Sequence, residues 1–457
     1  MKQSLILLFF SCHFIASAQV LDSTVQKNLQ KIYTHSLTNA QSYDWLRYLS
    51  KRVGNRLSGT PAAAAAVEYT RSILDTLGLD SVWLQPCMVP HWDRGEKELV
   101  RVVNSQKWGT FDLKSMALGN TTGTGSEGIL AQVIEVKSLK ELENLSDSKV
   151  KNKFVFFNRP MNPEHLRTFK AYGQAVDQRS QGPLIAQKKG ALGVLVRSMT
   201  VNFDDVPHTG ATKTDGNKPS IPAFAISTND ADRLSNILKT ESSLKIFMLN
   251  SARMLKQKLS YNVIGELRGR TKPNQIITVG GHLDSWDVGE GAHDDGAGCV
   301  QSIEVLRTYK KLGFKPRHTI RAVMFMNEEN GLAGGLAYAA DSTSGISHFA
   351  AIESDAGGFT PLGLSYEDAP KEMDLLAQIG KYLAVYNLRV GPGGSGADIS
   401  PLKGKARLLM GLDPDSQRYF DIHHTADDVF EKVSKRELEL GAAAMTSLIF
   451  LLDQLDK

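Results

Sequence analysis

Five short segments of this sequence concentrate histidine and carboxylate side chains. They span residues 281–284, 291–296, 327–331, 353–355 and 421–425, each directly after an apolar run or in a predicted loop. A single histidine or acid in such a place is usually a cap or a satisfied polar residue. Five clusters on successive strand–loop junctions are harder to explain in that way, because converging carboxylates would repel one another and resist ionising.

A pair of divalent metal ions would remove that repulsion. Zinc takes histidine and carboxylate ligands, and two ions held close together need a bridging carboxylate and a bridging water. The five segments offer histidines, terminal acids, a bridging aspartate and a spare glutamate that could act as a base. The pattern therefore favours a dinuclear hydrolytic centre.

Alternating strands and helices must position these segments. From residue 261 onward, apolar strands are expected at 276–279, 319–326, 349–353 and 408–410, with helices at 299–312 and 372–385 between them. A further helix follows the capping box of residues 434–437. This order predicts a mixed, mainly parallel α/β sheet flanked by helices. In such sheets active sites collect beyond the carboxyl ends of the strands, where the polar segments fall.

The first half of the sequence changes in predicted secondary structure, from a helix to short strands and loops. A helix is expected from Thr60 and Pro61 to Leu77, where Gly78 ends it. Residues 118–250 then show short β-like runs separated by loops rich in Gly, Ser, Asn and Pro. We interpret 118–250 as an inserted β-rich domain and 19–117 with 251–457 as the main domain; an elaborated single domain is the alternative.

The N-terminus has the features of a secretory signal peptide. Lys2 precedes an apolar run at 5–10, and Ala16-Ser17-Ala18 forms a small-residue cleavage site. Residues 1–18 are thus predicted to be removed after Ala18, which implies a secreted or periplasmic protein. Cys12 suggests a lipoprotein signal as a weaker alternative. No later segment is predicted to span a membrane.

Bulk composition excludes several classes of function. The 457 residues carry a net charge of +4, with 42% apolar and 22% charged residues mixed along the chain, so no nucleic-acid partner is expected. After signal removal only Cys87 and Cys299 remain. Two cysteines exclude a disulfide scaffold and a zinc site built on thiolates, although one bridge between them stays open.

The most specific motif is the run from Gly281 to Gly289, continued by Asp294-Asp295-Gly296. It resembles the hallmark of the zinc peptidase family that includes carboxypeptidase Q (plasma glutamate carboxypeptidase), bacterial leucyl aminopeptidase and the glutamate carboxypeptidases. The carboxypeptidase Q branch is the most similar. Further similar elements are Glu353–Gly357, His423-His424, Arg56–Gly59 and Pro90–Trp92. The resemblance covers most of the mature chain, the inserted region more loosely, and implies a zinc exopeptidase fold with a protease-associated-like insert.

Carried over position by position, the resemblance implies two Zn²⁺ ions per chain. The implied ligands are His282 and Asp355 on one ion, Glu329 and His424 on the other, and Asp294 between them. It also implies that Glu328 is the general base for a water held between the metals, and that the acid Asp284 orients His282. A cis peptide between Asp294 and Asp295 is implied as well.

Some choices between neighbouring residues stay open. Asp295 is the alternative bridge, although the spacing to the following glycines favours Asp294. For the last ligand, His423 is the alternative to His424. We prefer His424 because the motif His-Thr-x-x-Asp fits the family better when it begins at residue 424. The other notable histidines, expected to be structural, surface or bystander residues, are His91, His208 and His293.

These inferences predict an exported exopeptidase that cuts dipeptides or short peptides. The alternatives are an aminopeptidase on longer peptides, a glutaminyl cyclase-like acyltransferase with one zinc, or a domain that has lost catalysis. The preference for dipeptides and a homodimeric state come from the family alone. For the substrate carboxylate, the candidates are the loop 393–398 and the basic residues Lys403, Lys405, Arg407 and Arg418.

Overall fold

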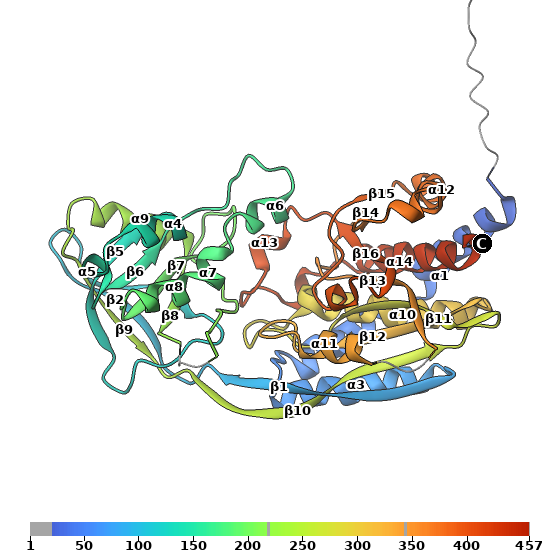
Figure 1. The fold of residues 1–457 in the computed structure, drawn as a ribbon, viewed down its shortest axis with the longest axis horizontal. Helices are drawn as coiled ribbons and strands as arrows, with labels where there is room; N and C mark the ends of the chain where they lie inside the picture. Colours follow the sequence, from blue (N-terminus) through green and yellow to red (C-terminus); the bar gives the residue numbers. More distant parts are fainter. Residues whose placement is uncertain (1–20, 217–219, 342–344, 457) are drawn as a thin grey trace, which may run out of the picture.

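Two eight-stranded sheets form the centres of two lobes (Figure 1). The computed structural model describes residues 21–216, 220–341 and 345–456. The predicted signal peptide at 1–18 lies outside these described residues. We call the lobe at the right of Figure 1 the peptidase lobe and the lobe at its left the insert lobe.

The sheet of the peptidase lobe has the order β1-β10-β12-β11-β13-β16-β14-β15. Its strands are β1 (Ser81–Asp93), β10 (Arg253–Leu267), β11 (Lys272–His282), β12 (His318–Phe325), β13 (Ser347–Glu353), β14 (Pro361–Tyr366), β15 (Arg389–Pro392) and β16 (Ala406–Pro414). The central strands β12, β11, β13 and β16 are mutually parallel, whereas β10 and β14 pair antiparallel to their neighbours. The predicted mixed, mainly parallel α/β fold is confirmed.

Helices cover both faces of this sheet. The helices of the lobe are α1 (Ser23–Asn39), α2 (Ser42–Tyr48), α3 (Pro61–Thr76), α10 (Ala297–Leu312), α11 (Ala333–Ala340), α12 (Met373–Leu383), α13 (Tyr419–Ile422) and α14 (Lys435–Leu455). Apolar residues of α3, α10 and α14 share one core, while α11 packs into a second core on the opposite face. Strands covered on both faces are expected to be largely apolar, and β12 is buried at every position. Its buried polar residues are partnered: Arg321, for example, pairs with Glu266 at 2.7 Å.

The C-terminal helix α14 begins as the capping box predicts. The Ser434 side chain accepts a hydrogen bond from the main-chain N–H of Glu437. Among the described helices, α14 is the one long and apolar enough to cross a membrane by length and composition, a case that the sequence interpretation did not foresee. However, 83% of its apolar window is buried within the molecule, as expected of a core helix.

The insert lobe has its own sheet, with the order β3-β2-β9-β5-β6-β7-β8-β4. Its strands are β2 (Glu98–Ser105), β3 (Gly109–Leu113), β4 (Ser115–Ala117), β5 (Ile129–Val136), β6 (Phe154–Phe157), β7 (Gly193–Arg197), β8 (Ala223–Ile226) and β9 (Lys245–Asn250). Its helices are α4 (Leu139–Asn144), α5 (Asp147–Val150), α6 (Thr168–Gly173), α7 (Asp177–Ser180), α8 (Gly182–Lys188) and α9 (Thr228–Leu238). Because β2, β3 and β4 pair within this sheet, the lobe extends N-terminal of the predicted start at residue 118.

The two lobes are joined by strands and by a side contact. The long antiparallel pair β1 and β10 carries the chain into and out of the insert lobe (Figure 1). On the other side, α6 lies next to α13, and Thr168 Oγ1 donates to the main-chain oxygen of Ser416 at 2.8 Å. The insert lobe therefore reaches the carboxyl end of the peptidase sheet.

Candidate metal centre

The five predicted metal ligands come together at the carboxyl end of the peptidase sheet. His282 is the last residue of β11, and Asp355 follows β13 by two residues. Glu329 lies in the loop after β12, Asp294 in the turn before α10, and His424 just after α13. Neighbouring parallel strands end at the same edge, so segments distant in sequence meet there.

Asp294 lies between two sets of ligand atoms. Its Oδ1 is 3.1 Å from His282 Nε2, and that nitrogen is 3.3 Å from Asp355 Oδ1. Its Oδ2 is 3.3 Å from His424 Nε2, and that nitrogen is 3.2 Å from Glu329 Oε2. We call the first set the His282 half of the centre and the second the His424 half.

The electrostatics of the cluster fit divalent cations. Burial, with the nearby Asp294 carboxylate, raises the pKa of Glu329 to about 7. Burial disfavours charging of His424, but the Glu329 and Asp294 carboxylates outweigh it and raise the His424 pKa to about 10. Within the described residues, the buried oxygens Asp294 Oδ2 and Glu329 Oε1 accept no hydrogen bond. A cation in each half would supply both the missing positive charge and the missing partners.

Glu328, the predicted base, lies beside this cluster without belonging to either half. Burial raises the pKa of its carboxyl group, although His282 opposes this, and the Asp355 and Glu329 carboxylates raise the pKa further. Its carboxylate makes no hydrogen bond or ion pair with the described residues. The group is therefore free to accept a proton from a molecule bound at the centre.

The sequence suggested that the Asp284 side chain orients His282, but its main-chain oxygen makes this contact. The main-chain oxygen of Asp284 accepts the hydrogen bond from His282 Nδ1, at 2.9 Å, while its carboxylate lies 3.9 Å from that nitrogen. The carboxylate instead accepts main-chain hydrogen bonds from Asn327 and Glu328, at 2.6 and 3.0 Å. The side chain of Asp284 thus fixes the backbone that carries Glu328.

Two other acids hold the backbone of the cluster. Asp295 accepts main-chain hydrogen bonds from His282 and Gly298, at 3.0 and 2.9 Å, so its oxygens are occupied. Asp428, the last residue of His-Thr-x-x-Asp, accepts from the main chain of His293 and Asp294. This favours Asp294 over Asp295 as the bridge. The peptide between Asp294 and Asp295 is cis, as the resemblance implies.

The remaining histidines near the centre have distinct surroundings. His293 Nδ1 accepts from the main-chain N–H of Gly358, and its ring stacks on Phe359, which agrees with a bystander role. The ring of His423 stacks on His424, with centroids 3.5 Å apart. Its Nε2 lies 3.8 Å from Asp294, farther than His424. His424 therefore has the better geometry for a ligand, since it faces two carboxylates.

The insert lobe supplies contacts that sequence reasoning did not find. The main-chain oxygen of Thr209 accepts from His424 Nδ1 at 3.2 Å, and the Thr209 N–H donates to the His424 oxygen at 3.0 Å. Arg179 donates to the Thr209 oxygen at 3.1 Å. His208 Nδ1 donates to the main-chain oxygen of His423 at 2.9 Å. These bonds hold His424 at its left-handed φ of 60°. No sequence motif marks the bonds that Thr209 and His208 make across the lobes, because each joins residues 215 apart in the sequence.

The basic residues proposed for substrate binding are engaged elsewhere. Lys403 pairs with Glu367, Arg407 with Glu372, and Arg418 with Glu437. The Lys405 ammonium donates to the main-chain oxygen of Ala339. In contrast, the predicted glycine-rich loop does line a cavity that reaches Asp355.

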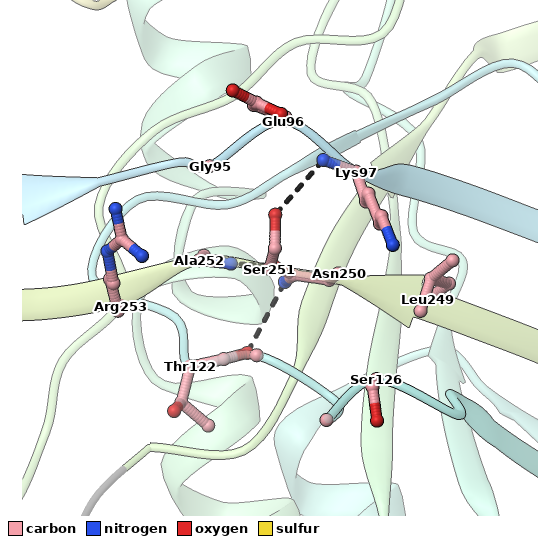
Figure 2. Close-up of a pocket in the computed structure, with 12 residues that line it drawn as sticks. Gly95, Glu96, Lys97, Thr122, Ser126, Leu249, Asn250, Ser251, Ala252 and Arg253 are labelled. Carbon is pink, nitrogen blue, oxygen red and sulfur yellow. Dashed lines mark hydrogen bonds between the residues drawn. The ribbon is translucent and has the colours of Figure 1, made fainter.

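A separate cavity of about 690 Å³ lies where β9 of the insert lobe leads into β10 (Figure 2). Its wall is polar, with the Lys97 N–H donating to Ser251 Oγ at 3.0 Å, and no histidine or cysteine lines it. We therefore assign no chemistry to it. Cys87 and Cys299 are buried and free, so the bridge left open above does not form.

Comparison with known proteins decides the family. The sequence model of peptidase family M28 matches residues 262–449, which include every predicted ligand. Carboxypeptidase Q of Xenopus laevis is 33% identical to this chain, and the alignment covers 95% of this chain and 90% of the relative. Carboxypeptidase Q of Homo sapiens is 31% identical, with coverage of 95% of this chain and 89% of the relative. The chain belongs to peptidase family M28. Its relatives that are 30–33% identical over 95% of this chain include six carboxypeptidase Q proteins, as the sequence resemblance predicted.

Solved structures of M28 peptidases have the same fold. The peptidase M28 precursor of Shewanella amazonensis superposes with a TM-score of 0.89 at 30% identity, covering 95% of this chain and 97% of that one. A zinc aminopeptidase of Bacillus subtilis gives a TM-score of 0.65 at 20% identity, covering 90% and 94%. The first similarity extends over both lobes, and the second shows that the fold is shared at low identity.

Proposed function

We propose that this M28 family member is an exported, dinuclear zinc exopeptidase that hydrolyses dipeptides or short peptides. One observation carries the proposal: the two oxygens of Asp294 face two separate histidine–carboxylate pairs. A bridging carboxylate of this kind is what two adjacent divalent ions need. Among the described residues, the buried oxygens Asp294 Oδ2 and Glu329 Oε1 accept no hydrogen bond, which supports the same interpretation.

The protein groups around the centre have complementary roles in this proposal. When bound, the zinc ions supply Lewis-acid activation of a water molecule and of the scissile carbonyl. Glu328 accepts the proton that the attacking water loses, and it delivers this proton to the leaving amine. The raised pKa of Glu328 suits a group that must hold the proton between these two steps. Asp284 keeps Glu328 in place through the main chain.

Hydrolysis of a peptide panel with and without metal tests this function. The purified protein would be stripped with a chelator, assayed on dipeptides, on longer peptides and on a peptide with N-terminal glutamine, and then reloaded with zinc. We expect loss of dipeptide hydrolysis on stripping and recovery on reloading. Undiminished hydrolysis by fully stripped protein would contradict the proposal, and cyclisation of the glutamine without hydrolysis would replace it.

The proposal that the protein is exported rests only on the predicted signal peptide, residues 1–18. Expression of the full chain in a bacterial host with a secretion pathway should give a processed protein that begins at Gln19. N-terminal sequencing of the periplasmic or culture fraction measures this directly. Full-length protein retained in the cytoplasm would contradict export.

A further inference from the structure

A cavity of about 500 Å³ lies beside the metal centre, between the two lobes. Asp355, a predicted metal ligand, forms part of its wall together with the glycine-rich loop 393–396. Across from them, the start of α6 contributes Arg167, Phe169 and Lys170 from the insert lobe. A volume of this size accommodates a small ligand such as one or two amino-acid residues.

The contacts of α6 hold these three residues over the cavity. Thr168 Oγ1 donates to the main-chain oxygen of Ser416 at 2.8 Å, and Gln417 Nε2 donates to the oxygen of Leu166 at 2.6 Å. The ring of Phe169 packs on Tyr419 and Phe420, with centroids 5.3 and 4.9 Å apart. The start of α6 is therefore anchored to the peptidase lobe by the Leu166 main chain, the Thr168 side chain and the Phe169 ring.

The opposite wall is shaped by glycines. A Cβ at Gly396, where φ is 152°, would overlap the Glu353 side chain at 2.3 Å, and a Cβ at Gly393 would meet Ser365 at 2.6 Å. Nothing lies within 4 Å of a Cβ at Gly394, which faces open space. The loop thus leaves room for a substrate residue, with Phe169 as the apolar surface on the other side.

The charges at the mouth of the cavity leave one cation without a partner. Arg167 lies 3.7 Å from Asp413, in an exposed ion pair that also lines the cavity. Glu353 is buried and accepts main-chain hydrogen bonds from Asp398 and Ile399. Lys170 pairs with no carboxylate among the described residues. At the mouth, the two cations Arg167 and Lys170 thus face one carboxylate, Asp413, and this single excess positive charge favours an anion there. The other two lining carboxylates lie deeper: Glu353 accepts main-chain hydrogen bonds, and Asp355 is a metal ligand in the proposed function.

We propose that Lys170 and Arg167 of the insert lobe bind the free α-carboxylate of the substrate's C-terminal residue, and thereby select dipeptides. This rests on the proposed function, because the metal centre must hold the scissile bond at the inner end of the same cavity. A dipeptide places its carboxylate one residue beyond that bond. A longer peptide would place an uncharged amide there and leave Lys170 unpaired.

Binding to a variant that does not turn over tests the subsite separately from catalysis. Zinc-loaded protein carrying Glu328→Gln would be titrated calorimetrically with alanyl-leucine, with alanyl-leucinamide and with alanyl-glutamic acid α-amide. Adding Lys170→Ala or Arg167→Ala should raise the Kd for alanyl-leucine about tenfold, as expected for loss of a hydrogen bond to a charged group. The Kd for alanyl-leucinamide should change by less than about twofold on the same reasoning.

Two further variants make the test specific. Lys170→Arg keeps the charge and should restore most of the affinity, while Lys188→Ala removes an exposed lysine of the insert lobe that does not line the cavity and should have no effect. Equal weakening of the acid and the amide, or none, would overturn the proposal. So would tighter binding of the α-amide with a side-chain carboxylate than of alanyl-leucine. Failure of the proposed function would show independently, as a wild-type protein that binds dipeptides without cutting them.

Discussion

The two halves of the candidate metal centre are built in different ways. In the His282 half, the imidazole is oriented by the main-chain oxygen of Asp284, two residues away in the same loop. In the His424 half, it is oriented by the main-chain oxygen of Thr209, which belongs to the other lobe. One half is therefore complete within the peptidase lobe, whereas the other requires the insert lobe. Because the insert lobe orients His424, it forms part of the candidate centre. Breaking its contact with His424 should weaken metal binding in the His424 half and spare the His282 half.

The largest effect is expected for Glu328, the proposed base, which lies beside the cluster and belongs to neither half. Glu328→Gln removes the proposed proton acceptor and none of the proposed metal ligands, so kcat should fall by about 10²–10⁴-fold, the usual contribution of general acid–base catalysis. Steady-state kinetics combined with metal analysis measures both quantities. Full activity with two zinc ions bound would show that the base is another residue.

Breaking the contact between the insert lobe and His424 should weaken one half of the centre alone. Arg179→Met removes the guanidinium that donates to Thr209 and lies 3.3 Å from His424 Nδ1. Metal affinity of the His424 half should fall about 10- to 100-fold, as for other groups that orient a ligand, while that of the His282 half stays unchanged. Competition with a chromophoric chelator would resolve the two steps.

A matched control for this variant lies in the same lobe. Arg197 is also buried in the insert lobe, but it pairs with Asp232, away from the centre. Arg197→Met should leave both metal affinities unchanged even if the lobe becomes less stable. Equal weakening of both halves by Arg179→Met would contradict the division described above.

A smaller effect distinguishes the two parts of Asp284. Asp284→Asn keeps the main-chain oxygen that orients His282 but weakens the hydrogen bonds from Asn327 and Glu328. We expect kcat to fall about tenfold, the cost of replacing a charged acceptor by a neutral one, with the metal affinity of the His282 half unchanged. A large loss of metal affinity, measured by the same chelator competition, would mean that the carboxylate orients His282 after all.

The last prediction concerns stability and leaves the metal centre aside: it is the pH dependence of the contact between the lobes. Burial lowers the pKa of His208 to about 3, so the folded protein keeps it neutral while the unfolded chain protonates it near 6.5. The contribution of His208 to the free energy of unfolding is therefore fully present above pH 6.5. It is lost as the pH falls from 6.5 towards 3, at about 1.4 kcal/mol for each pH unit.

His208→Asn removes this titration and retains a donor for the main-chain oxygen of His423. Urea unfolding at pH 6.5, 5.5 and 4.5, with chelator in every sample, should show a shallower acid loss in the variant than in the wild type. Identical slopes would mean that His208 is not kept neutral by burial.

Much of this architecture could be predicted from the sequence, for reasons that differ between the lobes. Strands β11, β12 and β13 are apolar because both faces are covered, and each ends in a polar segment, so the fold and the position of the centre follow from local patterns. The helix from Pro61 follows from its cap, since the Thr60 side chain accepts from the N–H of Ala63. Local motifs also named the histidines and carboxylates that the structure brings together, although their role as ligands stays a prediction.

What the sequence did not predict involves contacts between distant segments. The sequence pattern of residues 98–117 predicts short strands but does not show to which sheet they belong. Their hydrogen-bonded pairing with other strands of the insert lobe assigns them to its sheet. The orientation of His424 by Thr209, and the placement of Lys170 near Asp355, depend on how the lobes dock. The assignment of Asp284 as an orienting acid considered its side chain alone, whereas its main-chain oxygen makes the contact.

The central claim is that one carboxylate, Asp294, joins two metal sites of different origin. A crystal structure of zinc-loaded protein, with anomalous data collected above and below the zinc absorption edge, tests it most directly. We predict two anomalous peaks roughly 3.5–4 Å apart, one beside His282 and Asp355 and the other beside Glu329 and His424, with Asp294 between them. A single peak at full zinc occupancy, or two peaks that do not share Asp294, would contradict it.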